Sequence, residues 1–178
     1  HLTYDDYYPV FAGDDSPVKK LGWASFYTAS GITGVTMGLT GEAAVNPEIP
    51  AISLPFTMCH ELSHRRCIAL ERDANFGAYL ACRANDSIQF QYSGYFMAYR
   101  YCYNALVSAG GSVQAQAISS GETAELTRDL ADYRTFFAQK QSAKATKVAD
   151  KVNDTYIKAS GDSSGVASYG EVCDLLVN

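Results

Sequence analysis

Apolar residues recur at every third or fourth position over most of the second half of the chain, which is the spacing of an amphipathic helix. Glycine-containing breaks interrupt this pattern at intervals that suit separate helices. The pattern predicts helices over residues 87–109, 119–142, 143–160 and 166–178. We therefore expect the C-terminal half of the protein to be a helical bundle.

The N-terminal part of the chain is more varied. Residues 1–15 are acidic and rich in tyrosine, and we expect an irregular arm there. Ser16 and Pro17 are typical of a helix start and Gly31 is typical of a helix end, so a helix is predicted between them. Residues 32–46 are rich in Gly, Thr and Val, which favours a small β-hairpin.

Two further helices are expected in the middle of the chain. Pro55 suits the first turn of a helix, and Phe56, Met58 and Leu62 can bury one of its faces. A second helix is predicted over residues 71–82. The fold class that follows is α+β and mostly α-helical.

The first of these two helices carries the string HELSH, in which two histidines stand four residues apart. On a helix His60 and His64 lie on the same face, so both can bind one metal ion from one side. Glu61 then lies beside the ion, where a carboxylate can accept a proton from a metal-bound water and pass it to a leaving group. The motif indicates a zinc-dependent hydrolase with His60 and His64 as ligands and Glu61 as the base.

The motif supplies only two ligands, whereas a catalytic zinc ion normally has three protein ligands and one open position. His1 is the only other histidine, and a chain terminus is a poor anchor, so the third ligand must be a carboxylate or a thiolate. On the second predicted helix Glu71 and Asn75 share a face, while Asp73 points away from it. We predict Glu71 as the third ligand, ahead of Asp73.

Two neighbouring residues complete this prediction. Cys67 is the thiolate alternative, but one more turn along the same straight helix cannot complete a tetrahedral site. Asn75 stands one turn after Glu71, where its amide oxygen can accept the second N–H of a metal-bound imidazole. We therefore expect Asn75 to support the site.

The string HELSH followed by Glu71, Ala74 and Asn75 is similar to the glutamate-zincin pattern, in which HExxH precedes a helix with E-x-x-A-[DN], as in ImmA-type peptidases. Further blocks resemble, in order, an uncharacterised bacterial family described as a domain of unknown function. These blocks are LTGEAAVN (39–46), SLPFT (53–57), SGY (93–95) and GVASYG (165–170). The resemblance extends from about Leu21 to the end of the chain.

The resemblance implies a zincin-like fold with an HExxH helix, a second ligand helix, a β-hairpin ahead of them and a helical bundle behind. It implies that residues 16–178 form one metallopeptidase domain after the arm of residues 1–15. Members of the family resemble membrane-anchored bacterial proteins with hydrophobic spans ahead of this domain. We therefore expect a fragment of a longer protein whose soluble domain lies outside the cytoplasm. Family members commonly carry glycine at the position of Cys67, and the resemblance brings no substrate.

Other residues are candidates for contacts with a substrate. Peptidases of this kind stabilise the oxyanion with a hydrogen-bond donor, and Tyr95 and Tyr169 are the candidates because no histidine is spare. Gly41, Glu42 and Ala43 in the predicted hairpin are a candidate edge to which a peptide substrate could add as a strand. The alternative, that this hairpin only stabilises the fold, is equally compatible with the sequence.

Composition narrows the range of partners. The net charge of −5 and the pI near 5.1 leave no basic stripe, which argues against nucleic acid. No stretch reaches the roughly 18 to 20 apolar residues of a membrane span, so membrane contact is expected only through segments outside this chain. Five cysteines do not make a disulfide framework in a chain of 178 residues, and we expect buried free thiols.

Three functions are compatible with these features. The leading one is a zinc metallopeptidase that hydrolyses a peptide or protein through a metal-activated water. The second is an inactive zinc-binding sensor or interaction module, closed by a fourth ligand such as Asp73 or Cys67. In the third, no metal binds and the histidines are core residues. The combination of HELSH with Glu71 favours the first.

Overall fold

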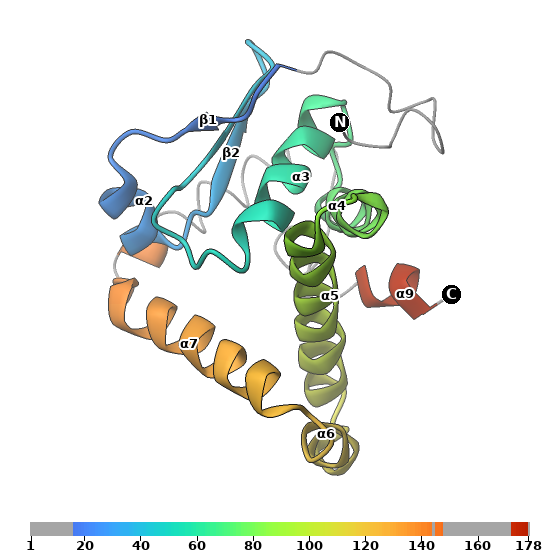
Figure 1. Cartoon of the computed structure of the whole chain (residues 1–178). Coiled ribbons are helices and arrows are strands. Elements are labelled where there is room, and N and C mark those ends of the chain that lie inside the picture. Colours follow the sequence, from blue (N-terminus) through green and yellow to red (C-terminus); the bar gives the residue numbers. More distant parts are fainter. Residues whose placement is uncertain (1–15, 144, 148–171, 178) are drawn as a thin grey trace.

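The computed structural model describes residues 16–143, 145–147 and 172–177. A three-stranded sheet lies on one side of the molecule and helices fill the rest (Figure 1). In chain order the elements are β1 (Lys19–Lys20), α2 (Ala24–Ser30), β2 (Gly34–Met37), β3 (Glu42–Val45), α3 (Leu54–Arg65), α4 (Glu71–Ala84), α5 (Ile88–Ser108), α6 (Ser112–Ser119), α7 (Ala124–Lys140) and α9 (Val172–Val177). The predicted α+β, mostly α-helical class is confirmed.

The hairpin predicted over residues 32–46 forms β2 and β3. These strands pair antiparallel, with Gly34 opposite Val45 and Met37 opposite Glu42. β1 pairs parallel with the other side of β3, so the order of the sheet is β1-β3-β2. β3 is therefore the central strand, and β2 is an edge strand of the described sheet.

The helix predicted between Ser16 and Gly31 begins later than expected. The short strand β1 precedes it, and α2 begins only at Ala24. The prediction of a helix start at Ser16 is wrong because the chain pairs with β3 at Lys19 and Lys20, and a pairing between distant segments cannot be read from a local capping signal. Gly31 does end the helix, with a left-handed φ of 78°.

α3 ends in a left-handed turn at Cys67, which has a φ of 66°. The N–H of Cys67 donates to the carbonyl oxygen of His64 at 2.9 Å, and the N–H of Ile68 donates to that of Ser63 at 3.2 Å. This pair of hydrogen bonds is a Schellman motif, in which glycine usually occupies the left-handed position. The chain thus makes the sharp turn between α3 and α4 with an ordinary L-residue.

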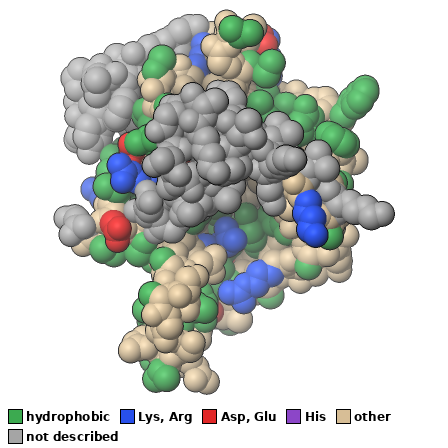
Figure 2. All heavy atoms as spheres, turned by 180° about the vertical axis from the view of Figure 1, so that it is seen from behind, with side chains coloured by type: hydrophobic (Ala, Val, Ile, Leu, Met, Phe, Trp, Pro, Cys, Tyr) green, Lys and Arg blue, Asp and Glu red, His purple; other side chains and the backbone are tan. Residues whose placement is uncertain are grey.

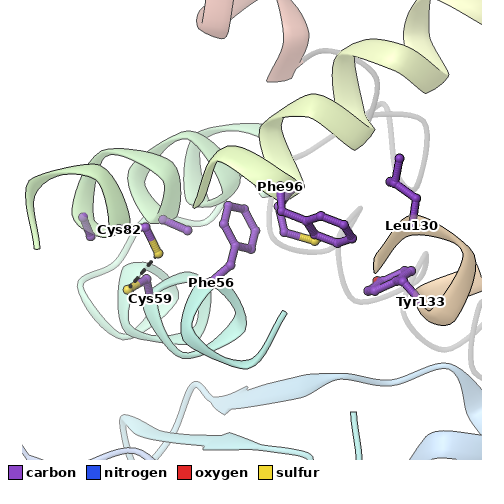
Figure 3. Close-up of a cluster of buried hydrophobic side chains, with 9 residues drawn as sticks. Phe56, Cys59, Cys82, Phe96, Leu130 and Tyr133 are labelled. Carbon is purple, nitrogen blue, oxygen red and sulfur yellow. Dashed lines mark hydrogen bonds between the residues drawn. The ribbon is translucent and has the colours of Figure 1, made fainter. Parts of the chain in front are cut away.

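The core centres on the packing of α3, α4 and α5 (Figure 3). Cys59 on α3 and Cys82 on α4 are fully buried, and the Cys82 thiol donates to the Cys59 sulfur at 3.7 Å. Gly94 on α5 permits this close packing, because a Cβ there would lie 2.7 Å from the Cβ of Cys82. Phe96 extends the cluster to α7, where its ring lies 5.7 Å from that of Tyr133.

The C-terminal half is helical, as predicted, but its divisions differ in one place. The helix predicted over 87–109 is confirmed as α5, while α6 is a separate short helix that the sequence pattern did not reveal. α7 begins only at Ala124, after Thr123 accepts a cap hydrogen bond from the N–H of Leu126 at 3.3 Å. Most of the helix predicted over 143–160 lies outside the described residues.

α6 and the adjoining end of α5 project from the body of the molecule (Figure 2). No charged residue occurs between Tyr101 and Gly121, and this projecting end exposes Val107, Val113 and Ile118. Within the described ranges, no helix combines the length and the hydropathy needed to cross a membrane.

Candidate metal centre

The structure brings the three predicted ligands together between α3 and α4. The Nε2 atoms of His60 and His64 lie 3.0 Å apart. Glu71 places Oε2 at 3.4 Å from Nε2 of His60 and Oε1 at 3.4 Å from Nε2 of His64. Ligand atoms held about 2.0–2.1 Å from a tetrahedral ion are separated by about 3.3 Å, so these three atoms have the spacing of one metal site. Of the described residues, these three form a group that could hold an ion.

Two local features produce this arrangement. His60 and His64 share one face of α3 because they are four residues apart. The turn at Cys67 then reverses the chain, and α4 begins at Glu71 itself. A carboxylate in the first turn of a helix is stabilised by the positive end of the helix dipole. The third ligand is thus held by the start of a helix rather than by a loop.

The second nitrogen of each imidazole has a different environment. Nδ1 of His64 lies 2.8 Å from the carbonyl oxygen of Ile68, and it must donate there because a carbonyl only accepts. Nε2 of a neutral His64 therefore carries the lone pair that a metal requires. Nδ1 of His60 is buried and has no hydrogen-bond partner among the described residues.

The electrostatics of the three groups are strongly coupled. Burial alone would raise the pKa of Glu71, but hydrogen bonds and charge interactions with His60 and His64 outweigh it and hold this pKa far below its ordinary value. Burial alone would lower the pKa of His64, but the interaction with Glu71 outweighs it and raises this pKa. Glu71 is thus an anion and draws positive charge to the site, which a proton or a metal ion can supply.

Glu61 lies beside this group and faces the sheet. Its side chain is buried, with 4% of its surface exposed, and burial raises its pKa, partly offset by His60 and by a hydrogen bond from Thr36. The Thr36 hydroxyl lies 2.7 Å from Oε2 of Glu61. A Cβ at Gly34 would lie 2.4 Å from Oε1 of Glu61, so this strand position leaves space for the carboxylate. Neither Gly34 nor Thr36 was among the predicted site residues, and their same-face spacing on β2 was the available signal.

The alternative ligands are not part of the cluster. Asp73 points away, as predicted, with a side chain 40% exposed and an ion pair with Arg72 at 3.0 Å. Cys67 occupies the turn and is exposed, and Cys102 and Cys173 are half-buried, so the prediction of buried cysteines holds only for Cys59 and Cys82. All five cysteines are free thiols, as predicted.

Asn75 is buried near the start of α4 but makes a different contact from the predicted one. Its Oδ1 accepts a hydrogen bond from the Tyr101 hydroxyl at 3.1 Å. Its Nδ2 has no partner among the described residues, and neither does Nδ1 of His60. The expected hydrogen bond between a ligand imidazole and Asn75 is therefore absent from this structure, and the oxygen of Ile68 fills that role for His64.

The two tyrosines predicted to stabilise an oxyanion are less well supported by the structure than the three predicted ligands. Tyr95 is 53% exposed and packs against Tyr79, which lies about 12 Å along α4 from Glu71. This position gives Tyr95 a packing role away from the ligands. Tyr169 lies outside the described residues.

The predicted substrate edge at Gly41, Glu42 and Ala43 is also not supported. Glu42 and Ala43 belong to the central strand β3, and Ala43 is buried. Among the described residues β1 pairs with β3 at Ala44 and Val45, so the burial of Ala43, and not pairing on both sides, is what argues against an edge there. The strand that lies against Glu61 is β2, through Gly34 and Thr36.

In the comparison with protein families, the model of a family described as "Protein of unknown function (DUF3810)" matches residues 2–177. Neither the curated proteins nor the solved structures gave a match.

Proposed function

The chain belongs to the DUF3810 family of proteins of unknown function, and we propose that it is a zinc-dependent metallopeptidase with a zincin-like fold. The observation that carries this proposal is the convergence of His60, His64 and Glu71 at the spacing of a tetrahedral site, with the Glu61 carboxylate beside them. Two imidazoles and one carboxylate are a ligand set of catalytic zinc ions.

The number of protein ligands supports a catalytic rather than a structural zinc site. Structural zinc ions usually have four protein ligands, whereas catalytic ones keep a position for water. In the described part of the chain the cluster contains three ligands. When bound there, zinc supplies a Lewis acid and an activated water.

Glu61 and His64 have separate roles in the proposed mechanism. Glu61 stands next to the ligands but has its own partner in Thr36, so it is available as a base rather than as a ligand. Burial raises the pKa of Glu61, which makes its carboxylate a stronger base than that of an exposed glutamate. His64 is held by Ile68 in the tautomer that leaves Nε2 free.

The sheet offers a place for an extended peptide at β2. The N–H of Asn46 donates to the carbonyl oxygen of Thr33 at 2.8 Å, so alternate residues starting with Thr33 direct their backbone groups to β3. The backbone groups of Gly34 and Thr36 then point to the opposite side, where no described strand pairs with β2. A peptide that adds to this edge would lie next to Glu61.

One observation favours the second candidate, a zinc-binding module without activity. Glu61 and Glu71 are only 4% and 8% exposed, so the present arrangement leaves little room for a substrate at the ligands. A metallopeptidase must admit a peptide beside β2, while a binding module need not.

Metal analysis and peptide cleavage together test the proposal. The purified protein is expected to contain about one zinc per chain by elemental analysis, and to cleave members of an unstructured peptide library as detected by mass spectrometry. Glu61→Gln is expected to keep the zinc and to lose cleavage, while Glu125→Gln, on the exposed side of α7, keeps both. Cleavage that survives Glu61→Gln would rule out this mechanism, and zinc without any cleavage would favour the binding module.

A further inference from the structure

One side chain of the sheet reaches the proposed base. The hydroxyl of Thr36 lies 2.7 Å from Oε2 of Glu61 and 2.9 Å from the backbone carbonyl oxygen of the same residue. A threonine hydroxyl carries one proton and can donate it to either oxygen. A single side chain on β2 is therefore bonded to both the backbone and the carboxylate of the residue between the two ligand histidines.

Gly34, on the same face of β2 as Thr36, also lies against the side chain of Glu61. Gly34 precedes Thr36 by two residues, so their Cβ positions lie on one face of the strand. A Cβ at Gly34 would come within 2.6 Å of Cγ and 2.7 Å of Cδ of Glu61, far inside van der Waals contact. The absence of a side chain at one position and the hydroxyl at the other thus act on the same carboxylate.

The Glu61 carboxylate is also attracted toward the two histidines, in competition with its hydrogen bond to Thr36. It is close enough to His60 and His64 for their charges to lower its pKa. A carboxylate that turned toward the ligand atoms would occupy the open position and become a fourth ligand, which is the arrangement of a structural site. A base has to stand beside the metal, within hydrogen-bond reach of the reacting water.

We propose that Thr36 is a positioning residue that holds the Glu61 carboxylate against β2 and away from the metal, in the space that Gly34 leaves. This inference rests on the proposed function. Under this proposal the helices α3 and α4 supply the three ligands, and the sheet fixes the position of the Glu61 carboxylate beside them.

A purely structural reading is that the Thr36 hydroxyl only satisfies the carbonyl oxygen of Glu61 and fastens β2 to α3. Under that reading, its loss changes stability but leaves the chemistry beside the metal unchanged. The two readings predict different affinities for a small molecule that binds the metal and also contacts Glu61. Acetohydroxamate chelates zinc through two oxygens and offers a proton to a carboxylate beside the ion.

The test measures zinc content by elemental analysis and acetohydroxamate affinity by calorimetry in the zinc-loaded protein. Thr36→Val keeps the shape of the side chain and removes the hydroxyl. It is expected to retain zinc and to weaken acetohydroxamate binding about tenfold, the effect of one hydrogen bond to a charged group. Thr36→Ser is expected to restore the affinity, and Thr40→Val, at an exposed position of the same hairpin, to leave it unchanged. If Thr36→Val does not fold, Thr36→Ala replaces it in the comparison with Thr36→Ser.

The outcomes separate this inference from the proposed function. A wild-type protein without zinc overturns both. Zinc at full content with unchanged affinity in Thr36→Val overturns the positioning role alone, and so does a loss that Thr36→Ser fails to restore. In the Glu61→Gln background, Thr36→Val is expected to add little, because Thr36 acts through Glu61; a further tenfold loss there would contradict the inference.

Discussion

His64 donates a hydrogen bond from Nδ1 to the carbonyl oxygen of Ile68, 2.8 Å away. Ile68 is also the residue whose N–H closes the turn at the end of α3, through the carbonyl oxygen of Ser63. The turn that leads the chain from α3 to α4 therefore also orients the imidazole of a candidate metal ligand. Changes in this turn are expected to affect both stability and metal affinity.

Cys67→Gly is expected to stabilise the protein. A left-handed φ of 66° strains an L-residue by roughly 1–2 kcal/mol, and the larger backbone entropy of glycine in the unfolded chain offsets part of this gain. The net increase in the free energy of unfolding is expected to be about 0.5–1 kcal/mol, measured by urea denaturation. Cys67→Ala, which removes the exposed thiol but keeps the Cβ, is the control and should change little. A destabilised glycine variant would contradict the strain argument.

Glu71→Gln is expected to reduce zinc affinity by one to several orders of magnitude, because it removes the only anionic ligand of the cluster. Asp73→Asn is the matched control, since Asp73 lies two residues away with its side chain 40% exposed. Competition with a chromogenic chelator measures both affinities. Equal losses in the two variants would show that net charge, rather than coordination, holds the ion.

The metal-free protein is expected to show a pH dependence that originates in the pairing of His64 with Glu71. The raised pKa of His64 gives stability that is complete below the ordinary value of 6.5 and is lost as the pH rises through the raised value. The lowered pKa of Glu71 gives stability that is complete above its ordinary value of 4.5 and is lost as the pH falls below it. The pair therefore contributes most between these two ordinary values.

Chemical denaturation of wild type and His64→Gln at several pH values measures this contribution as a difference, which largely removes the separate titration of Glu61. The difference should be largest near pH 5.5 and should shrink toward pH 8.5. A difference that grows with pH would contradict the assignment. Saturating zinc, which takes the place of the proton, should reverse the trend.

Gly94→Ala is expected to destabilise the core by about 1–3 kcal/mol, even though alanine is the better helix former. The added Cβ would lie 2.7 Å from the Cβ of Cys82, so α4 and α5 would have to separate. Gly22→Ala, where no atom lies within 4 Å of the added Cβ, is expected to change stability much less. Urea denaturation monitors both, and equal effects would show that the contact is unimportant.

The sequence predicted most of the ligand cluster because its determinants are local. His60 and His64 are one helical turn apart, and the same helical geometry favoured Glu71 over Asp73. The position of the third predicted ligand also depends on the turn at Cys67 and on the hydrogen bonds that close this turn. These hydrogen bonds depend on the backbone geometry of residues 66–70, and none of the residue types in this segment predicts that geometry.

The errors came from contacts between distant segments. Ser16 and Pro17 have the local character of a helix start, but Lys19 and Lys20, which follow them, pair with β3. Thr36 was not predicted because its partner, Glu61, comes from another element of the fold.

All three candidate metal ligands lie between His60 and Glu71, in the segment formed by α3, the turn at Cys67 and the start of α4. Closing so short a loop around an ion costs little chain entropy, so this segment can bind metal before the sheet has assembled. The proposed base, Glu61, acquires its partner Thr36 only when β2 docks on α3, which requires contacts between segments distant in sequence. For the proposed zinc site, metal binding during folding is thus separable from the positioning of Glu61, and that positioning depends on the slower, non-local step.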